Sequence, residues 1–207
     1  MNIQFVHLPG DSLDYDVLQE AAASIKGVEG TICEIGTRRG GSLRYIVDGV
    51  LGNQDHNRNV VCIDPYGNID YADREHVMMK HDYTNDMRNE TLPNIYMYLQ
   101  GKPINVVFMC MEDTEFFNRF ADGVPFYQEH KIMSNQYSLV FFDGPHDTPS
   151  LLKELEFFYP RTPQGAYFIF DDVAAYPHDI IHEDLLKNGF EAVKYGEQGR
   201  KISYVKK

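Results

Sequence analysis

Acidic residues follow the apolar runs of this sequence with unusual regularity. Of five almost continuously apolar segments, four carry carboxylates at or near their ends, and these acids are Glu34, Asp64, Asp143, Asp171 and Asp172. Glu112 and Asp113 stand just past the remaining segment. Like charges brought together cost free energy unless cations or hydrogen-bond donors compensate them. If the segments are neighbouring strands, their ends predict a bound cation, a polyhydroxyl ligand or both.

The loop after the first apolar run indicates which cofactor this edge could hold. It reads CEIGTRRGGS over residues 33–42, so it lacks the G-x-G-x-x-G spacing that admits a dinucleotide pyrophosphate. What remains is E-x-G-x-x-x-G, in which Glu34 would repel a diphosphate but attract a cofactor that carries positive charge. Asp64, at the end of the second run, is well placed to accept hydrogen bonds from a ribose diol. The alternative is that the glycines only turn a strand into a helix.

The elements that must position these residues alternate along the chain. The apolar runs cover residues 30–36, 59–64, 104–110, 137–144 and 165–172, which is typical of strands buried on both faces of a parallel sheet. Helical patterns lie at 11–27, 41–51, 87–100, 149–160 and 178–190, and two further strands, at 190–197 and 200–207, must be antiparallel. This order predicts an α/β fold with a doubly wound, mostly parallel seven-stranded sheet and an antiparallel C-terminal strand.

Composition limits the class of protein. A chain of 207 residues with 43% hydrophobic residues fits one domain over residues 1–207. The net charge of -12 argues against nucleic-acid and anionic-membrane partners. No apolar stretch is long enough for a membrane helix and no export signal is recognisable, so a soluble, cytoplasmic protein is expected. Cys33, Cys62 and Cys110 lie in apolar runs and are expected to be reduced core residues.

The motifs EIGTRRGGS, IDPYG, FFDGPHD and FYPRTPQGAYFIFDDV together resemble class I S-adenosylmethionine-dependent methyltransferases. The closer resemblance is to metal-dependent sugar O-methyltransferases of the macrocin type. It implies a Rossmann-like fold and a set of residues that bind S-adenosylmethionine. The loop would contact the methionine part, Asp64 would hold the ribose, and an acid after the third strand would lie near the adenine. The set so implied is Glu34, Gly36, Gly40, Ser42, Asp64, Glu112 and Asp113.

The same resemblance assigns Asp143, Asp171 and Asp172 as ligands of a divalent cation. Three carboxylates form an all-oxygen site that favours Mg²⁺, with Mn²⁺ or Ca²⁺ as alternatives. Such an ion would chelate neighbouring hydroxyls of a small polyol, sugar or catechol-like acceptor and lower the pKa of one of them. His146, three residues after Asp143, is the candidate general base, and Asp143 with it the candidate catalytic pair.

Several alternatives stay open at this stage. The acids at the strand ends could merely cap helices and turns, and His146 could be a helix-start residue without a catalytic part. A nicotinamide-dependent oxidoreductase, or a methyltransferase-like protein that binds cofactor without catalysis, would share this scaffold. Residues 1–28 are expected to form a leading helical segment and residues 65–103 a lid that shapes the substrate. Its candidate contacts are Tyr66, Tyr71, His76, His81 and Tyr83. A homodimer is compatible with this size and fold.

Overall fold

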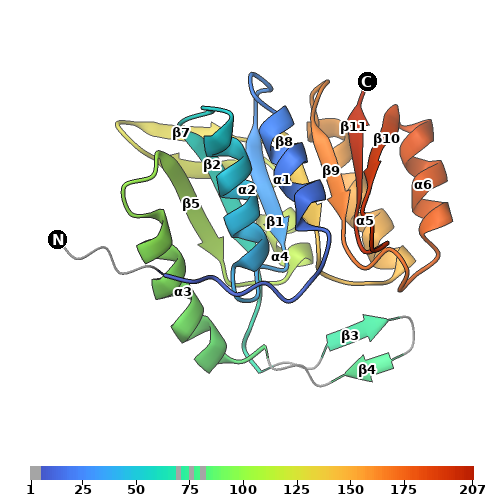
Figure 1. Cartoon of the computed structure of the whole chain (residues 1–207), viewed down its shortest axis with the longest axis horizontal. Helices are drawn as coiled ribbons and strands as arrows, with labels where there is room; N and C mark the ends of the chain where they lie inside the picture. Colours follow the sequence, from blue (N-terminus) through green and yellow to red (C-terminus); the bar gives the residue numbers. More distant parts are fainter. Residues whose placement is uncertain (1–5, 69–70, 75–76, 80–82) are drawn as a thin grey trace.

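A parallel sheet forms the central layer of the molecule. The computed structural model of the protein describes residues 6–68, 71–74, 77–79 and 83–207. Within these ranges seven strands belong to one sheet: β1 (Thr31–Ile35), β2 (Arg58–Ile63), β5 (Ile104–Met109), β8 (Tyr137–Phe142), β9 (Tyr167–Phe170), β10 (Phe190–Tyr195) and β11 (Ile202–Lys206). Their spatial order is β10-β11-β9-β8-β1-β2-β5 (Figure 1).

Only β11 runs against the other strands of this sheet. The pairs β1–β2, β1–β8, β2–β5 and β8–β9 are parallel, whereas β11 is antiparallel to both β9 and β10. The predicted doubly wound sheet with an antiparallel C-terminal strand is therefore confirmed. The apolar runs were informative because β1 and β8 are buried along their whole length.

Helices cover both faces of the sheet and create two cores. One face packs against α1 (Tyr15–Ser24), α2 (Gly41–Gly52) and α3 (Asn85–Leu99); the other packs against α4 (Asp113–Arg119), α5 (Thr148–Phe158) and α6 (His178–Lys187). A short 3₁₀ turn, Tyr159–Arg161, follows α5. Successive strand residues point to opposite faces, so Ile32 of β1 lies in the first core and Cys33 in the second. At the carboxyl ends of the parallel strands, the loops that follow the strands lie at one edge of the sheet, between the two helix layers.

Two short hairpins and one helix were not foreseen. They are β3 (Tyr71–Arg74) with β4 (Val77–Met79), β6 (Val124–Tyr127) with β7 (Lys131–Ser134), and α4. Segment 65–103 contains α3, in agreement with the helix expected at 87–100, and the β3–β4 hairpin, while its role as a lid stays a prediction. Strands of three or four residues in polar surroundings give too few alternating positions to be recognised.

The cysteine prediction was wrong at one of its three positions. Cys33 and Cys62 are free and buried in strands, as expected, but Cys110 is exposed because it follows the last residue of β5. None of the helices in the described part of the chain combines the length and apolar character that a bilayer crossing requires.

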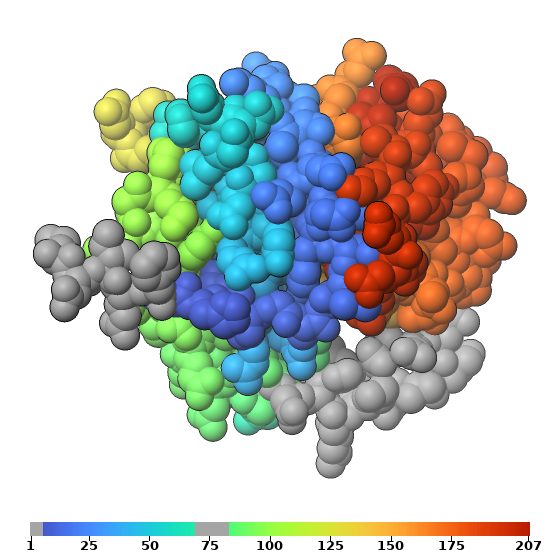
Figure 2. Space-filling view, viewed as in Figure 1, coloured from blue at the N-terminus to red at the C-terminus, as the bar shows by residue number. Residues whose placement is uncertain are grey.

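The segment before α1 crosses the carboxyl edge of the sheet (Figure 1). Leu8 is fully buried in the core of the α1–α3 face. The carboxylate of Asp14 accepts hydrogen bonds from the backbone amides of Gln198 (3.0 Å) and Arg200 (2.8 Å), in the turn between β10 and β11. The N-terminal residues, blue in Figure 2, accordingly lie against the red C-terminal strands. The segment before α1 and the β10–β11 turn thus meet beside the strand ends.

Candidate active site

Backbone hydrogen bonds hold the ends of β1, β8 and β9 together at one edge. The amide of Asp143 donates to the carbonyl of Ile35 (3.0 Å) and that of Asp171 to the carbonyl of Phe142 (3.0 Å). Gly36 has φ 88°, and a Cβ there would stand 2.0 Å from the carbonyl oxygen of Asp143. Glycine is therefore required at position 36 by the close approach of two strand ends, whatever ligand the loop binds. The expected convergence of the strand-end acids follows from this packing.

Glu34 is a fully buried carboxyl beside the glycine-rich loop. Ser42, in the first turn of α2, donates its hydroxyl to Oε1 of Glu34 at 2.6 Å. The other oxygen, Oε2, and the neighbouring Thr37 Oγ1 make no hydrogen bond of good geometry to a described residue, although the Thr37 hydroxyl and the Cys62 thiol lie near the carboxyl and act to lower its pKa. Burial raises the pKa of Glu34 to about 7. Gly40, with left-handed backbone, is the N-cap of α2 and completes the loop.

Asp64 organises the loop that faces it across the strand ends. Its Oδ2 accepts a hydrogen bond from the amide of Arg38 (2.8 Å) and its Oδ1 one from the amide of Tyr66 (3.1 Å). Burial raises the pKa of Asp64 to about 6. The hydroxyl of Tyr66 donates to the carbonyl oxygen of Arg38 at 2.6 Å. Tyr66 is thus buried in the loop and does not offer the substrate contact expected of it.

The remaining proposed lid contacts divide between described and undescribed residues. The ring of Tyr83 lies 5.5 Å from the guanidinium of Arg38, which also pairs with Asp11. Tyr71 belongs to β3, and His76 and His81 lie outside the described residues. The structure therefore links Tyr83 to the arginine of the glycine-rich loop and leaves the substrate role of the lid as a prediction.

His146 lies between two of the strand-end carboxylates. Its Nε2 is 3.6 Å from Oδ1 of Asp143, and its Nδ1 is 3.8 Å from Oδ2 of Asp172. Burial disfavours the charged imidazole, but Asp143, Asp172 and Asp171 together outweigh it and raise the pKa of His146. Burial and the charge of Asp171 raise the pKa of Asp143. This arrangement supplies a titratable imidazole oriented by carboxylates, as general-base catalysis requires.

Asp171 is engaged by a lysine that the sequence patterns alone did not single out. Lys201 Nζ, fully buried, donates to Oδ2 of Asp171 at 2.8 Å, to Oγ of Ser12 at 2.6 Å and to the carbonyl of Leu13 at 2.8 Å. Ser12 donates its hydroxyl to Oδ2 of Asp171 at 2.8 Å, and the amide of Asp172 donates to Oδ1 at 2.8 Å. Burial alone would raise the pKa of Asp171, but Lys201 lowers it below its ordinary value.

Asp172 has a cationic partner of its own. Arg200 lies with one terminal nitrogen 2.6 Å from Oδ1 of Asp172, and its Nε is 3.6 Å from Oδ1 of Asp171. Strand register explains both pairs, because Ile202 of β11 opposes Phe170 of β9 in antiparallel pairing. One and two further steps place Lys201 opposite Asp171 and Arg200 opposite Asp172. The signal in the sequence was a pair of dipeptides of opposite charge, Asp-Asp directly after β9 and Arg-Lys directly before β11.

These pairs bear on the predicted divalent cation. A Mg²⁺ site needs carboxylate oxygens directed at one point in octahedral geometry. Here both oxygens of Asp171 accept hydrogen bonds and one oxygen of Asp172 is paired with Arg200. Among the residues that the structure describes, no group of three His, Cys, Asp or Glu side chains could hold a metal ion. The residues as arranged do not fit the three-carboxylate site that the sequence predicted.

Glu112 and Asp113 lie at the start of α4, next to the end of β5. Glu112 is the exposed N-cap residue and Asp113 the first helical residue. Asp113 lies close to Glu154 of α5, which is fully buried, and burial together with Asp113 raises the pKa of Glu154 well above its ordinary value. The predicted adenine role of Glu112 or Asp113 stays a prediction.

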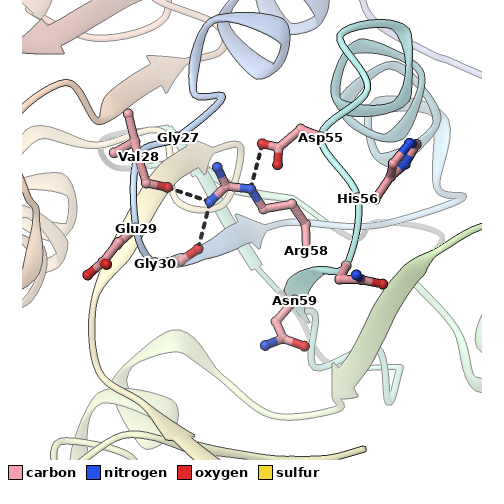
Figure 3. A pocket seen from close by; sticks show the side chains of 9 residues that line it. Gly27, Val28, Glu29, Gly30, Asp55, His56, Arg58 and Asn59 are labelled. Carbon is pink, nitrogen blue, oxygen red and sulfur yellow. Dashed lines mark hydrogen bonds and ion pairs between the residues drawn. The ribbon is translucent and has the colours of Figure 1, made fainter.

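A pocket at the opposite, amino-terminal edge of the sheet has a structural explanation (Figure 3). Its wall includes Arg58, whose guanidinium donates to Asp55 (2.7 Å) and to the carbonyls of Val28 (2.6 Å) and Gly30 (3.2 Å). Arg58 thereby ties the chain before β1 to the start of β2. Since its donors are used in this way, the carboxyl edge remains the candidate active site.

The strand order and the acid-lined carboxyl edge define a Rossmann-like fold of the class I methyltransferase type. Residues 33–173 match the family described as "Methyltransferase domain". This span covers more than half of the chain, so the protein belongs to that family. The expectation of a methyltransferase is confirmed, and the nicotinamide oxidoreductase alternative was wrong. Comparison with curated protein sequences gives no match.

Solved structures share the fold over nearly the whole chain. The O-methyltransferase NovP is 17% identical with a TM-score of 0.60, covering 93% of this chain and 78% of its own. The O-methyltransferase TomG from Streptomyces achromogenes, in complex with SAM, is 14% identical with a TM-score of 0.60, covering 97% and 82%. CalS11, a TDP-rhamnose 3'-O-methyltransferase, is 16% identical with a TM-score of 0.56, covering 93% and 78%.

Proposed function

We propose that this methyltransferase transfers a methyl group from S-adenosylmethionine to a hydroxyl oxygen of a small acceptor. The observation that carries the proposal is the unpartnered oxygen of buried Glu34 beside a glycine-rich loop. A buried acceptor without a donor is costly, so the site is prepared for a ligand that brings one. The structure of TomG, which was solved in complex with SAM, supports this choice of methyl donor.

The loop residues fit the parts of that cofactor in chemical kind. Glu34 Oε2 and Thr37 Oγ1 are the unpartnered groups that would receive an ammonium donor. Asp64 is already oriented by two backbone amides, and its remaining lone pairs would accept from ribose hydroxyls. Gly36 and Gly40 keep side chains out of the loop, while Ser42 holds Glu34 in place.

S-adenosylmethionine supplies an electrophilic methyl group when it is bound. The work of the protein is then to align the acceptor oxygen and remove its proton. His146 is the residue that we assign as the general base, because Asp143 and Asp172 flank both of its ring nitrogens and favour the protonated product. The acceptor oxygen forms its bond to the methyl carbon as the carbon–sulfur bond breaks, and the proton passes to the imidazole.

The acceptor that we propose is a small molecule with neighbouring hydroxyls, such as a sugar, polyol or catechol. Support comes from CalS11, which is a methyltransferase of TDP-rhamnose, a nucleotide-linked sugar. The negative net charge of -12 favours neither nucleic acid nor an anionic membrane as partner. The proposed mechanism does not use Mg²⁺, because Asp171 and Asp172 form ion pairs with Lys201 and Arg200. A homodimer stays a prediction.

The first test is calorimetric titration of the protein with S-adenosylmethionine and S-adenosylhomocysteine, with NAD⁺ as the control. We expect saturable binding of both sulfur compounds and none of NAD⁺. Absence of binding for both would contradict the proposal. In a screen of hydroxylated acceptors, His146→Gln should retain cofactor affinity and lose about 100-fold or more of the turnover rate. Equal turnover in the variant and wild type would remove His146 from the mechanism.

A further inference from the structure

Two cations are built into the part of the site where three carboxylates meet. Lys201 is 0% exposed and its ammonium makes all three of its hydrogen bonds within the protein, to Asp171, Ser12 and Leu13. Arg200 is about one third exposed and contacts Asp172 from the solvent side. Both come from the turn that leads into β11, opposite the acids that follow β9. The positive charges are therefore fixed by the same register that fixes the acids.

The charges at this edge balance without an added ion. Asp171 and Asp172 contribute two negative charges, which Lys201 and Arg200 match with two positive ones, while the third carboxylate, Asp143, faces His146. A divalent ion placed among them would face an ammonium and a guanidinium at close range, which disfavours it. To coordinate Asp171 it would also have to displace a fully buried lysine from its carboxylate partner.

From this arrangement we propose that Lys201 and Arg200 take the place of a divalent cation. They neutralise the carboxylates of Asp171 and Asp172, so that this site functions without Mg²⁺. Asp172 bridges the two halves of the site, because one of its oxygens faces Arg200 and the other faces His146. Arg200 is thus a positioning residue: it holds the carboxylate that orients the imidazole. The inference deepens the proposed function, rests on it and concerns the same edge of the sheet.

Manganese binding tests the inference independently of the acceptor. Titration of the whole protein with Mn²⁺, followed by electron paramagnetic resonance of the free ion, needs neither cofactor nor substrate. Wild type is expected to show no saturable binding in the submillimolar range. Arg200→Gln, which frees Asp172 beside Asp143, is expected to gain one Mn²⁺, because two carboxylates with water ligands suffice for such an ion. Arg200→Lys, which keeps the charge, should stay without binding.

Each result decides the matter. Saturable Mn²⁺ binding by wild type would overturn the proposal, and so would a complete lack of binding in Arg200→Gln, since the acids would then not form a latent ion site. Lys201→Met provides a second variant at the buried position, and Arg200→Gln covers the case in which that variant does not fold. Cofactor binding is measured separately with S-adenosylhomocysteine. Absence of that binding would contradict the proposed function, whereas saturable Mn²⁺ binding by wild type would contradict this inference.

Discussion

Two pairs of acids share one edge of the sheet, yet their surroundings differ. Glu34 and Asp64 are held by hydroxyl and amide donors, and burial raises the pKa values of both. Asp171 and Asp172 instead contact Lys201 and Arg200, and Lys201 lowers the pKa of Asp171. The second pair is compensated within the protein, whereas the first keeps capacity for a ligand that carries donors and positive charge. Convergence of acids alone therefore does not define a metal site.

The largest expected effect is on stability, at the compensated pair. Lys201→Met leaves the carboxylate of Asp171 buried without its cation, which should lower the free energy of unfolding by about 3–5 kcal/mol. The double variant Lys201→Met/Asp171→Asn removes both charges and should recover most of that loss. Urea unfolding of the two variants and wild type measures the difference. Equal stability of the single variant and wild type would show that Asp171 is not held by Lys201.

The next effect is on affinity, at the other pair. Glu34→Gln removes the negative charge that would meet the cofactor ammonium, so the affinity for S-adenosylhomocysteine should fall about 100-fold. The same variant should be at least as stable as wild type at pH 8, because it no longer buries a charge. Calorimetry and urea unfolding report these two quantities. Unchanged affinity would remove Glu34 from the cofactor site, while a loss of stability would assign the affinity change to misfolding.

A pH dependence should accompany the raised pKa of Glu34. With a pKa of about 7, its ionised fraction falls about tenfold from pH 8 to pH 6, and cofactor affinity should fall in proportion. The folded-state pKa lies above the ordinary 4.5, so the contribution of Glu34 to stability falls as pH rises from about 4.5 to 7. Calorimetry at several pH values should show the affinity slope in wild type. A slope that persists in Glu34→Gln would assign the titration to another group.

The smallest effect is expected at Ser42, which supports Glu34 without contributing charge. Ser42→Ala loses the 2.6 Å hydrogen bond to Oε1. We expect the binding free energy of S-adenosylhomocysteine to weaken by about 0.5–1.5 kcal/mol, and the dependence of the affinity on pH to be retained. Calorimetry beside wild type measures both quantities. A loss as large as that of Glu34→Gln would mean that Ser42 contacts the cofactor directly.

The sequence predicted the sheet and the convergence of acids because both follow from local patterns. β1 and β8 are continuously apolar, and the acids follow such runs directly, so parallel pairing was enough to bring Glu34 and Asp143 to one edge. Gly36 was recognised as special, although the carbonyl of Asp143 already requires a glycine there.

The partners of the acids could not be predicted in the same way. Lys201 and Arg200 oppose Asp171 and Asp172 only through the register of β11 against β9, which local patterns do not determine. Ser12 reaches Asp171 across 159 positions of the chain, from residues that were expected in the leading helix but that precede α1. Cys110 was assigned to the core because its neighbours are apolar, but the strand ends one residue before it.

The contacts between the segment before α1 and the turn that leads into β11 constrain the order in which the site can form. Ser12, Leu13 and Asp14 each have a hydrogen-bond partner among residues 198–201, and β11 must enter the sheet between β9 and β10. During synthesis on the ribosome, Asp171 and Asp172 therefore emerge before the two cations that neutralise them. The first half of the chain can form its parallel strands early, but the site closes only after the final strand has left the exit tunnel.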